Sequence, residues 1–239
     1  MKVSLGRAKR ALTKQVYQAY DSLFETDHYW NYRFQNSGFH QPNYTFDSNK
    51  IAFIHLPKTG GTTISKLLQQ DTKQRFVNLD IHRPISSLCP PNSFSYVTII
   101  RHPIDRVWSQ YQMVLRSPSD YPYHREANKG LAYLLKHCWS VRNMACRYYT
   151  ARVRHEPHGE SIQLAYANLK KFKAVLDFAH FSTEVPAFLA NYDLDHLVIP
   201  HERKSKYPSP SVEEQALIAK YNQYDIDLYE KWKTHGRTN

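Results

Sequence analysis

A lysine, two glycines and three threonines stand together between two apolar segments of the sequence. The segment reads Pro57-Lys58-Thr59-Gly60-Gly61-Thr62-Thr63. Adjacent glycines permit a tight turn and let backbone N–H groups come close to a ligand. An ammonium and several hydroxyl groups add donors at the same point, so the segment predicts a site for a phosphate or sulfate group. It is not a Walker A loop, GxxxxGK[ST], because Lys58 precedes the glycines.

A second candidate anion-binding segment is RHPIDRVWSQY, residues 101–111. A guanidinium such as that of Arg101 binds phosphate through two parallel hydrogen bonds, and the Ser109 hydroxyl adds one donor. An enzyme that transfers a bound phosphate or sulfate group to a hydroxyl group also needs a general base that takes the hydroxyl proton. Histidine is the natural residue for a base with a pKa near neutrality. His55, beside the glycines, and His82, between the two segments, are the candidates.

The elements that position these residues can be read from hydrophobic periodicity. Residues 51–54 form a short apolar run that predicts a buried strand, and Ile64, Leu67 and Leu68 share one face of a following helix. The free N–H groups and the dipole at the start of that helix favour an anion. Residues 75–79 predict a second strand with His82 in the loop after it. Residues 94–101 predict a third strand, followed by an amphipathic helix from Pro103.

The remaining chain predicts further helices around one more strand. The strand is expected at residues 174–177, helices at 161–172 and 182–192, and a final helix is expected from a capping box of Ser211 and Glu214. We therefore expect an α/β, P-loop-like three-layer fold with a mostly parallel sheet of four or five strands flanked by helices. Ligand sites in such sheets gather at the carboxyl ends of the strands.

Length and composition limit the class of protein. The chain has 239 residues, of which 41% are hydrophobic, and a formal net charge of +11. These values fit one folded domain whose partner is anionic. Only three cysteines are present, with no CxxC pair, so neither a disulfide framework nor a structural zinc site is expected. We expect residues 1–50 to form a basic helical arm and lead-in, and residues 51–239 to form the catalytic domain.

The two motifs resemble those of a known family. HLPKTGGTTISKLL, residues 55–68, and RHPIDRVWSQY are similar to the donor-binding segments of carbohydrate sulfotransferases that use 3'-phosphoadenosine 5'-phosphosulfate (PAPS). The resemblance is to the heparan-sulfate O-sulfotransferase type, sulfotransferase family 2. It extends faintly from about Ile51 to Trp232 and is specific at the two motifs. It implies a PAPS-dependent sulfotransferase with PAPS as co-substrate and no metal.

The resemblance also implies roles for single residues. The turn binds the 5'-phosphosulfate through these residues: Lys58, Thr59, Gly60, Gly61, Thr62 and Thr63. Arg101 and Ser109 bind the 3'-phosphate, which distinguishes PAPS from ATP. His82 matches the position of the family's catalytic base, whereas His55 is a rival that can instead orient Lys58. His102 departs from the family, which often has an acidic or amide residue there.

Other basic residues are further candidates for ligand contact. Arg147 matches a family arginine near the cofactor. In related enzymes a basic segment near this point of the chain borders the nucleotide, so further candidates here are Arg203, Lys204 and Lys206. The polar segment 112–130 is expected to be a long surface excursion whose basic residues form a rim for an anionic acceptor: Arg116, His124, Arg125 and Lys129.

We therefore expect in-line sulfuryl transfer from PAPS to a hydroxyl group of a glycan or a small metabolite. The alternatives are an ATP- and magnesium-dependent phosphotransferase and a non-catalytic polyanion-binding protein. Nucleic acid is not expected as a partner, because the basic residues do not form one stripe. No stretch is apolar enough for a signal peptide or membrane span, so we expect a bacterial-type cytoplasmic enzyme unless an anchor was trimmed. The acceptor and the oligomeric state cannot be read from the sequence.

Overall fold

The computed structural model describes residues 50–77, 95–150, 156–199 and 207–236. All of them belong to one compact unit, Asp47–Asn239. The expected N-terminal arm and lead-in lies outside the described residues except for Lys50.

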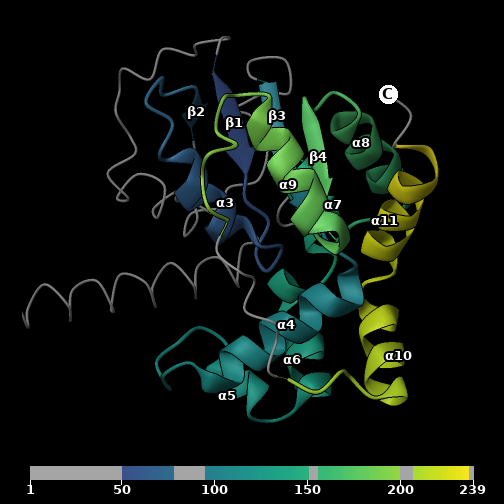
Figure 1. Ribbon diagram of the computed structural model, residues 1–239. Helices are drawn as coiled ribbons and strands as arrows, with labels where there is room; N and C mark the ends of the chain where they lie inside the picture. The colour runs from purple at the N-terminus through teal and green to yellow at the C-terminus, as the bar shows by residue number, and fades with distance from the viewer. Residues whose placement is uncertain (1–49, 78–94, 151–155, 200–206, 237–239) are drawn as a thin grey trace, which may run out of the picture. The chain divides into compact units, whose positions relative to one another are not determined.

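Four parallel strands form the sheet, in the order β2-β1-β3-β4. In chain order they are β1 (Ile51–Ile54), β2 (Phe76–Val77), β3 (Ser95–Ile100) and β4 (Ala174–Asp177). β1 pairs with β2 and β3, and β3 pairs with β4, each time in parallel. This confirms the expected mostly parallel sheet and brings the carboxyl ends of the strands to one edge (Figure 1).

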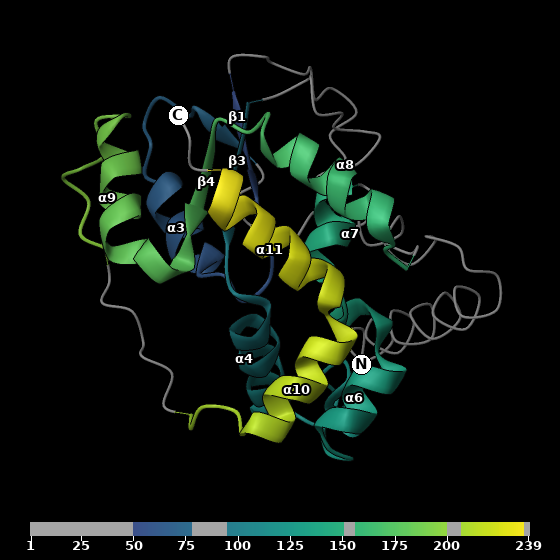
Figure 2. The same ribbon diagram turned by 90° about the vertical axis from the view of Figure 1, so that its right-hand side faces the viewer.

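Helices cover both faces of the sheet, which confirms the three-layer α/β class (Figure 2). One face packs against α3 (Gly61–Leu68) and α9 (Phe181–Ala190). The other face packs against α7 (Met144–Thr150), α8 (Gly159–Leu169) and α11 (Gln223–His235). Successive side chains of a strand point to opposite faces, so Phe53 packs toward the first group and Ile54 toward the second.

A further group of helices extends from the carboxyl edge of the sheet. It consists of α4 (Pro103–Arg116), α5 (His124–Ala127), α6 (Leu131–His137) and α10 (Val212–Tyr221). Their buried side chains form a separate apolar cluster that includes Val107, Leu134 and Ile218. Two short 3-10 turns complete the described chain, η1 (Trp139–Val141) and η2 (Phe178–His180).

The structure differs from the sequence expectations in two segments. The expected surface excursion at residues 112–130 is partly helical, because α4 continues to Arg116 and α5 follows. The expected single final helix is divided at Asn222 into α10 and α11. At this break, the Asn222 Oδ1 atom accepts a hydrogen bond from the Asn143 N–H (2.9 Å). The bond ties Asn222 to a segment that is distant in the chain.

Candidate functional site

The loop from His55 to Gly60 joins β1 to α3 at the carboxyl edge of the sheet. Lys58 and Gly60 both have left-handed backbone angles, with φ of 70° and 82°. A left-handed lysine is uncommon, because its Cβ crowds the backbone. The buried Thr59 hydroxyl donates to the Leu56 carbonyl oxygen at 2.8 Å and fixes the loop from within. The Thr59 side chain therefore shapes the candidate site, while Lys58 is half-buried beside it.

The two glycines are required for different reasons. Gly60 precedes α3 in the left-handed conformation that glycine adopts without cost. A Cβ on Gly61 would lie 2.1 Å from Cδ2 of His55, so Gly61 is needed for close packing. His55 is 6% exposed and also packs against the Phe53 ring, with centroids 5.6 Å apart. His55 thus packs between Phe53 and the glycine turn.

The start of α3 has features that favour an anion. The backbone N–H groups of Gly61 and Thr62 have no acceptor inside the helix because they stand in its first turn, while Thr63 donates to the Gly60 carbonyl oxygen at 3.1 Å. The first turn of α3 contains no acidic residue. The helix dipole and these donors therefore favour a negatively charged group at this point.

Two other positive charges act on the Lys58 ammonium of this turn. Burial, together with the positive charges of Arg101 and Arg116, lowers the pKa of the Lys58 ammonium below its usual value. Arg116 ends α4, donates from Nε to the Gln112 carbonyl oxygen (2.9 Å), and lies 3.6 Å above the Tyr207 ring. Within the described residues, no carboxylate forms an ion pair with Lys58 or Arg116. An anionic ligand would relieve the repulsion among these cations.

Arg101 connects the two sequence motifs. It follows β3, and its Nη1 atom donates a hydrogen bond to the Lys58 carbonyl oxygen at 3.0 Å. Its guanidinium carbon also lies 4.4 Å from the centre of the Phe178 ring. The expected pair of donor-binding segments therefore meets at the same edge of the sheet.

Ser109 lies half-buried on α4, between Arg101 and Arg116 in the chain. It precedes Arg116 by two helical turns, and residues at this spacing share one face of a helix. This placement is compatible with the expected role of Ser109, because the same face leads to the cations near Lys58.

The end of β4 contributes residues that the sequence argument missed. Asp177 is 2% exposed and accepts hydrogen bonds from the Ala179 N–H (3.0 Å), Lys233 Nζ (3.0 Å) and the Tyr229 hydroxyl (3.2 Å). The next residue, Phe178, contacts both Gly60 and Arg101. Their place in the sequence could have identified them as site residues, because they stand at the end of a predicted parallel strand and ligand sites gather where such strands end.

The described contacts of Arg147 are with residues of its own part of the chain. Its side chain is 2% exposed, forms an ion pair with Glu156 (2.8 Å), and donates from Nε to the Arg142 carbonyl oxygen (3.0 Å). Trp139 lies beneath its guanidinium, 5.1 Å from guanidinium carbon to ring centre. These contacts give Arg147 a structural role at the start of α7.

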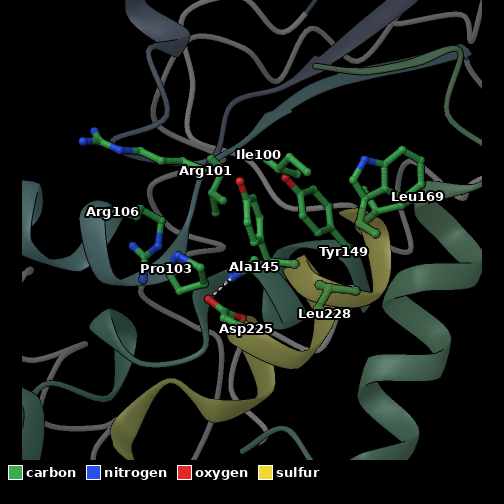
Figure 3. A pocket seen from close by; sticks show the side chains of 12 residues that line it. Ile100, Arg101, Pro103, Arg106, Ala145, Tyr149, Leu169, Asp225 and Leu228 are labelled. Carbon is green, nitrogen blue, oxygen red and sulfur yellow. Dashed lines mark hydrogen bonds between the residues drawn. The ribbon is translucent and has the colours of Figure 1, made fainter. Parts of the chain in front are cut away.

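A pocket lies behind Arg101, between the end of β3 and the helices α4, α7 and α11 (Figure 3). Tyr149 and Leu228 line this pocket, and Figure 3 shows the Arg101 side chain pointing away from them. Asp225 accepts hydrogen bonds there from the Ala145 and Cys146 N–H groups, at 2.9 and 2.8 Å. The free space fits about one water molecule, so a nucleotide does not fit.

Burial sets the charges around this pocket. It raises the pKa of the Asp225 carboxyl and lowers that of the Arg106 guanidinium. Arg106 donates to the Val141 carbonyl oxygen at 2.9 Å and to Gln110 Oε1 at 3.1 Å. Asp225 thus joins α11 to α7, and Arg106 joins α4 to the 3-10 turn η1.

Several predicted site residues fall outside the described residues. These are His82, Arg203, Lys204 and Lys206. The expected acceptor rim is described: His124 and Arg125 lie in α5, and Lys129 follows it with Nζ 4.4 Å from the Tyr133 ring centre. In the described part of the chain, no helix is long and apolar enough to cross a membrane. The same residues contain no group of three or more metal-ligating side chains.

Neither protein-family models nor curated protein sequences give a match to this chain.

Proposed function

We propose that this protein is a sulfotransferase that moves a sulfuryl group from PAPS to a hydroxyl group of a carbohydrate-type acceptor. The observation that carries the proposal is the hydrogen bond from Arg101 to the Lys58 carbonyl oxygen, which joins the two motifs at one edge of the sheet. A donor with phosphate groups on both the 3' and 5' positions needs two anion sites at a fixed separation. The glycine turn and Arg101 supply such a pair.

Each residue of the two motifs has a role in this scheme. The N–H groups of Gly61 and Thr62 at the start of α3 bind the 5'-phosphate, with Thr63 beside them, and the loop residues Thr59 and Gly60 hold the turn in shape. Arg101 and Ser109 bind the 3'-phosphate. Lys58 lies against the sulfuryl group and the bridging oxygen, where negative charge grows as the donor bond breaks.

The transfer itself is a single displacement at sulfur. The acceptor oxygen forms a new bond to sulfur while the bond from sulfur to the bridging oxygen breaks, and 3'-phosphoadenosine 5'-phosphate (PAP) leaves with the electron pair. A base takes the acceptor's proton. His82 is proposed for this step from the family resemblance, since His55 is buried against Gly61. Positioning and electrostatic stabilisation supply most of the acceleration in related phosphoryl transfers.

Calorimetric binding of PAP and AMP to the wild type and to Arg101→Ala tests the donor site. AMP lacks the 3'-phosphate, so the wild type is expected to bind PAP much more tightly than AMP. Arg101→Ala should weaken PAP binding about 10- to 100-fold more than AMP binding, the range expected for lost charge-assisted hydrogen bonds to the 3'-phosphate, while any loss through the turn affects both ligands alike. Lys220→Ala, which removes an exposed charge from α10, is the matched control and should change neither affinity.

Equal affinities of the wild type for PAP and AMP would refute the 3'-phosphate assignment. Tighter binding of ATP with magnesium would then favour the phosphotransferase alternative. Salt-sensitive binding to mixed polyanions, without preference for a nucleotide, would favour the non-catalytic alternative.

A further inference from the structure

Phe178 lies against both the glycine turn and Arg101. It belongs to neither motif and stands at the end of β4, the strand farthest from β2 in the sheet. We propose that Phe178 is a positioning residue for the donor, which fixes the 3'-phosphate arginine relative to the 5'-phosphate turn. The inference rests on the proposed function and adds a residue that determines donor selectivity.

The first contact concerns the turn. A Cβ added to Gly60 would lie 2.9 Å from Cε2 and 3.0 Å from Cδ2 of Phe178, so the ring lies flush against the glycine backbone. The Phe181 ring stands beside it, with Cε2 3.0 Å from the same point and the two ring centres 5.7 Å apart. Two rings therefore occupy the space next to Gly60 that a side chain at this position would need.

The second contact concerns the arginine. The Arg101 guanidinium carbon lies 4.4 Å from the centre of the Phe178 ring, within the range of a favourable cation–π interaction. The N–H donors of a guanidinium lie in its plane, so contact of its face with a ring does not compete with hydrogen bonds at its edges. One edge donates to the Lys58 carbonyl oxygen. The ring and the carbonyl oxygen together restrict both the position and the rotation of the guanidinium.

Phe178 is itself held in place by the residue before it. Asp177 accepts from the Ala179 N–H, which closes the turn that contains Phe178. The same carboxylate is held by Lys233 and Tyr229 of α11, and the Asp177 N–H donates to Glu184 of α9 at 2.6 Å. The ring is therefore anchored to helices on both faces of the sheet. A side chain anchored in this way can transmit a fixed geometry to Gly60 and Arg101.

Phe178→Leu and Phe181→Leu form a matched pair for the test. Both remove a ring that lies beside Gly60, and Phe178→Leu also removes the ring that lies 4.4 Å from the Arg101 guanidinium carbon. PAP and AMP affinities are measured by calorimetry for the wild type, the two leucine variants and Phe178→Tyr, with thermal unfolding as a check of folding. Phe178→Leu is expected to weaken PAP binding about 3- to 30-fold and AMP binding less than about 2-fold. Phe181→Leu should change both affinities by the same factor.

Phe178→Tyr keeps the ring and should keep the preference for PAP over AMP within about 3-fold of the wild type. Equal losses of PAP and AMP affinity in Phe178→Leu would overturn the inference, as would an equal loss of preference in Phe181→Leu. If Phe178→Leu does not fold, Phe178→Met removes the ring with a flexible side chain and is judged by the same criteria. A wild type that binds PAP and AMP equally would overturn the donor site and this inference with it, so the two failures are distinct.

Discussion

Arg101 and Lys58 lie 43 residues apart in the chain, and the Nη1 atom of Arg101 donates a hydrogen bond to the Lys58 carbonyl oxygen at 3.0 Å. This bond fixes the peptide that follows Lys58, a residue whose backbone is left-handed with φ 70°. It also places a second positive charge beside the Lys58 ammonium. The same contact therefore stabilises the shape of the turn and creates the charge repulsion that an anion would relieve.

Gly61→Ala is expected to lower the free energy of unfolding by about 1–3 kcal/mol and to weaken PAP binding, because the new methyl group would overlap the His55 ring. Urea unfolding and calorimetry measure the two effects. Gly159→Ala is the control: it is also the first residue of a helix, α8, and a Cβ there meets nothing within 4 Å. It should be neutral or slightly stabilising.

A double variant tests the cause of that loss. His55→Ala should cost less stability in the Gly61→Ala background than in the wild type, because the smaller side chain makes room for the methyl group. Strict additivity of the two substitutions would contradict direct steric overlap between His55 and residue 61.

Lys58→Met is expected to raise the melting temperature by about 1–4 °C while it weakens PAP binding at least about 10-fold. The ammonium is half-buried and repelled by Arg101 and Arg116, so the protein without ligand gains stability when the charge is removed. Differential scanning calorimetry and binding calorimetry measure the two changes. Lys66→Met, an exposed lysine of α3, should alter neither by a comparable amount.

The pH dependence of the Lys58 effect follows from the direction of its pKa shift. The pKa of the folded protein lies below the usual 10.5, so between these two values the unfolded chain binds more protons. Stability of the wild type therefore rises with pH in that window, and the advantage of Lys58→Met should shrink there. An advantage that grows with pH would mean that the Lys58 charge stabilises the fold.

Asp177→Asn is expected to lower the free energy of unfolding by about 1–3 kcal/mol at pH 7. Burial alone would raise the pKa of Asp177, but hydrogen bonds from Ala179 and Lys233 outweigh it, and the pKa lies below its usual value. The carboxylate therefore contributes stability above the unfolded pKa of 3.8, which is lost as the pH falls through the folded pKa. Urea unfolding from pH 7 to pH 3 should show the cost of the variant shrinking below about pH 4.

The exposed Asp195 provides the comparison for this pH series. Asp195→Asn should have nearly the same stability as the wild type at every pH. If Asp177→Asn behaves in the same way, the hydrogen bonds from α11 to Asp177 contribute nothing to stability.

Arg147→Met is expected to lower the free energy of unfolding by about 2–4 kcal/mol and to leave PAP affinity within about 2-fold of the wild type. The substitution removes the nearly buried partner of Glu156 and a hydrogen bond to the Arg142 carbonyl oxygen. Thermal unfolding and calorimetry on the same samples separate the two effects. A selective loss of PAP affinity at unchanged stability would restore the role that the family resemblance implied for Arg147.

The local sequence was sufficient to predict several strands and the start of a helix. Residues 51–54 and 174–177 were expected as strands and are β1 and β4, and the capping box of Ser211 and Glu214 begins α10 as expected. These features depend on side-chain periodicity, glycine conformations and cap hydrogen bonds within a few residues. The parallel direction of β1 and β2, and of β3 and β4, was predictable because helices lie between them along the chain.

Tertiary structure alone decided which distant side chains meet. Phe178 reaches Gly60 because β4 pairs with β3 and ends at the same edge as β1, and no pattern within either segment specifies that contact. Arg116, at the end of α4, acts on the charge of Lys58 from 58 residues away in the chain, and Arg147 forms an ion pair with Glu156. Such pairings depend on strand order and helix packing. Phe178 and Gly60, for example, are separated by more than a hundred residues of the chain. The sequence by itself therefore determined the chemistry of the turn, and the packing of β4 and α4 determined its surroundings.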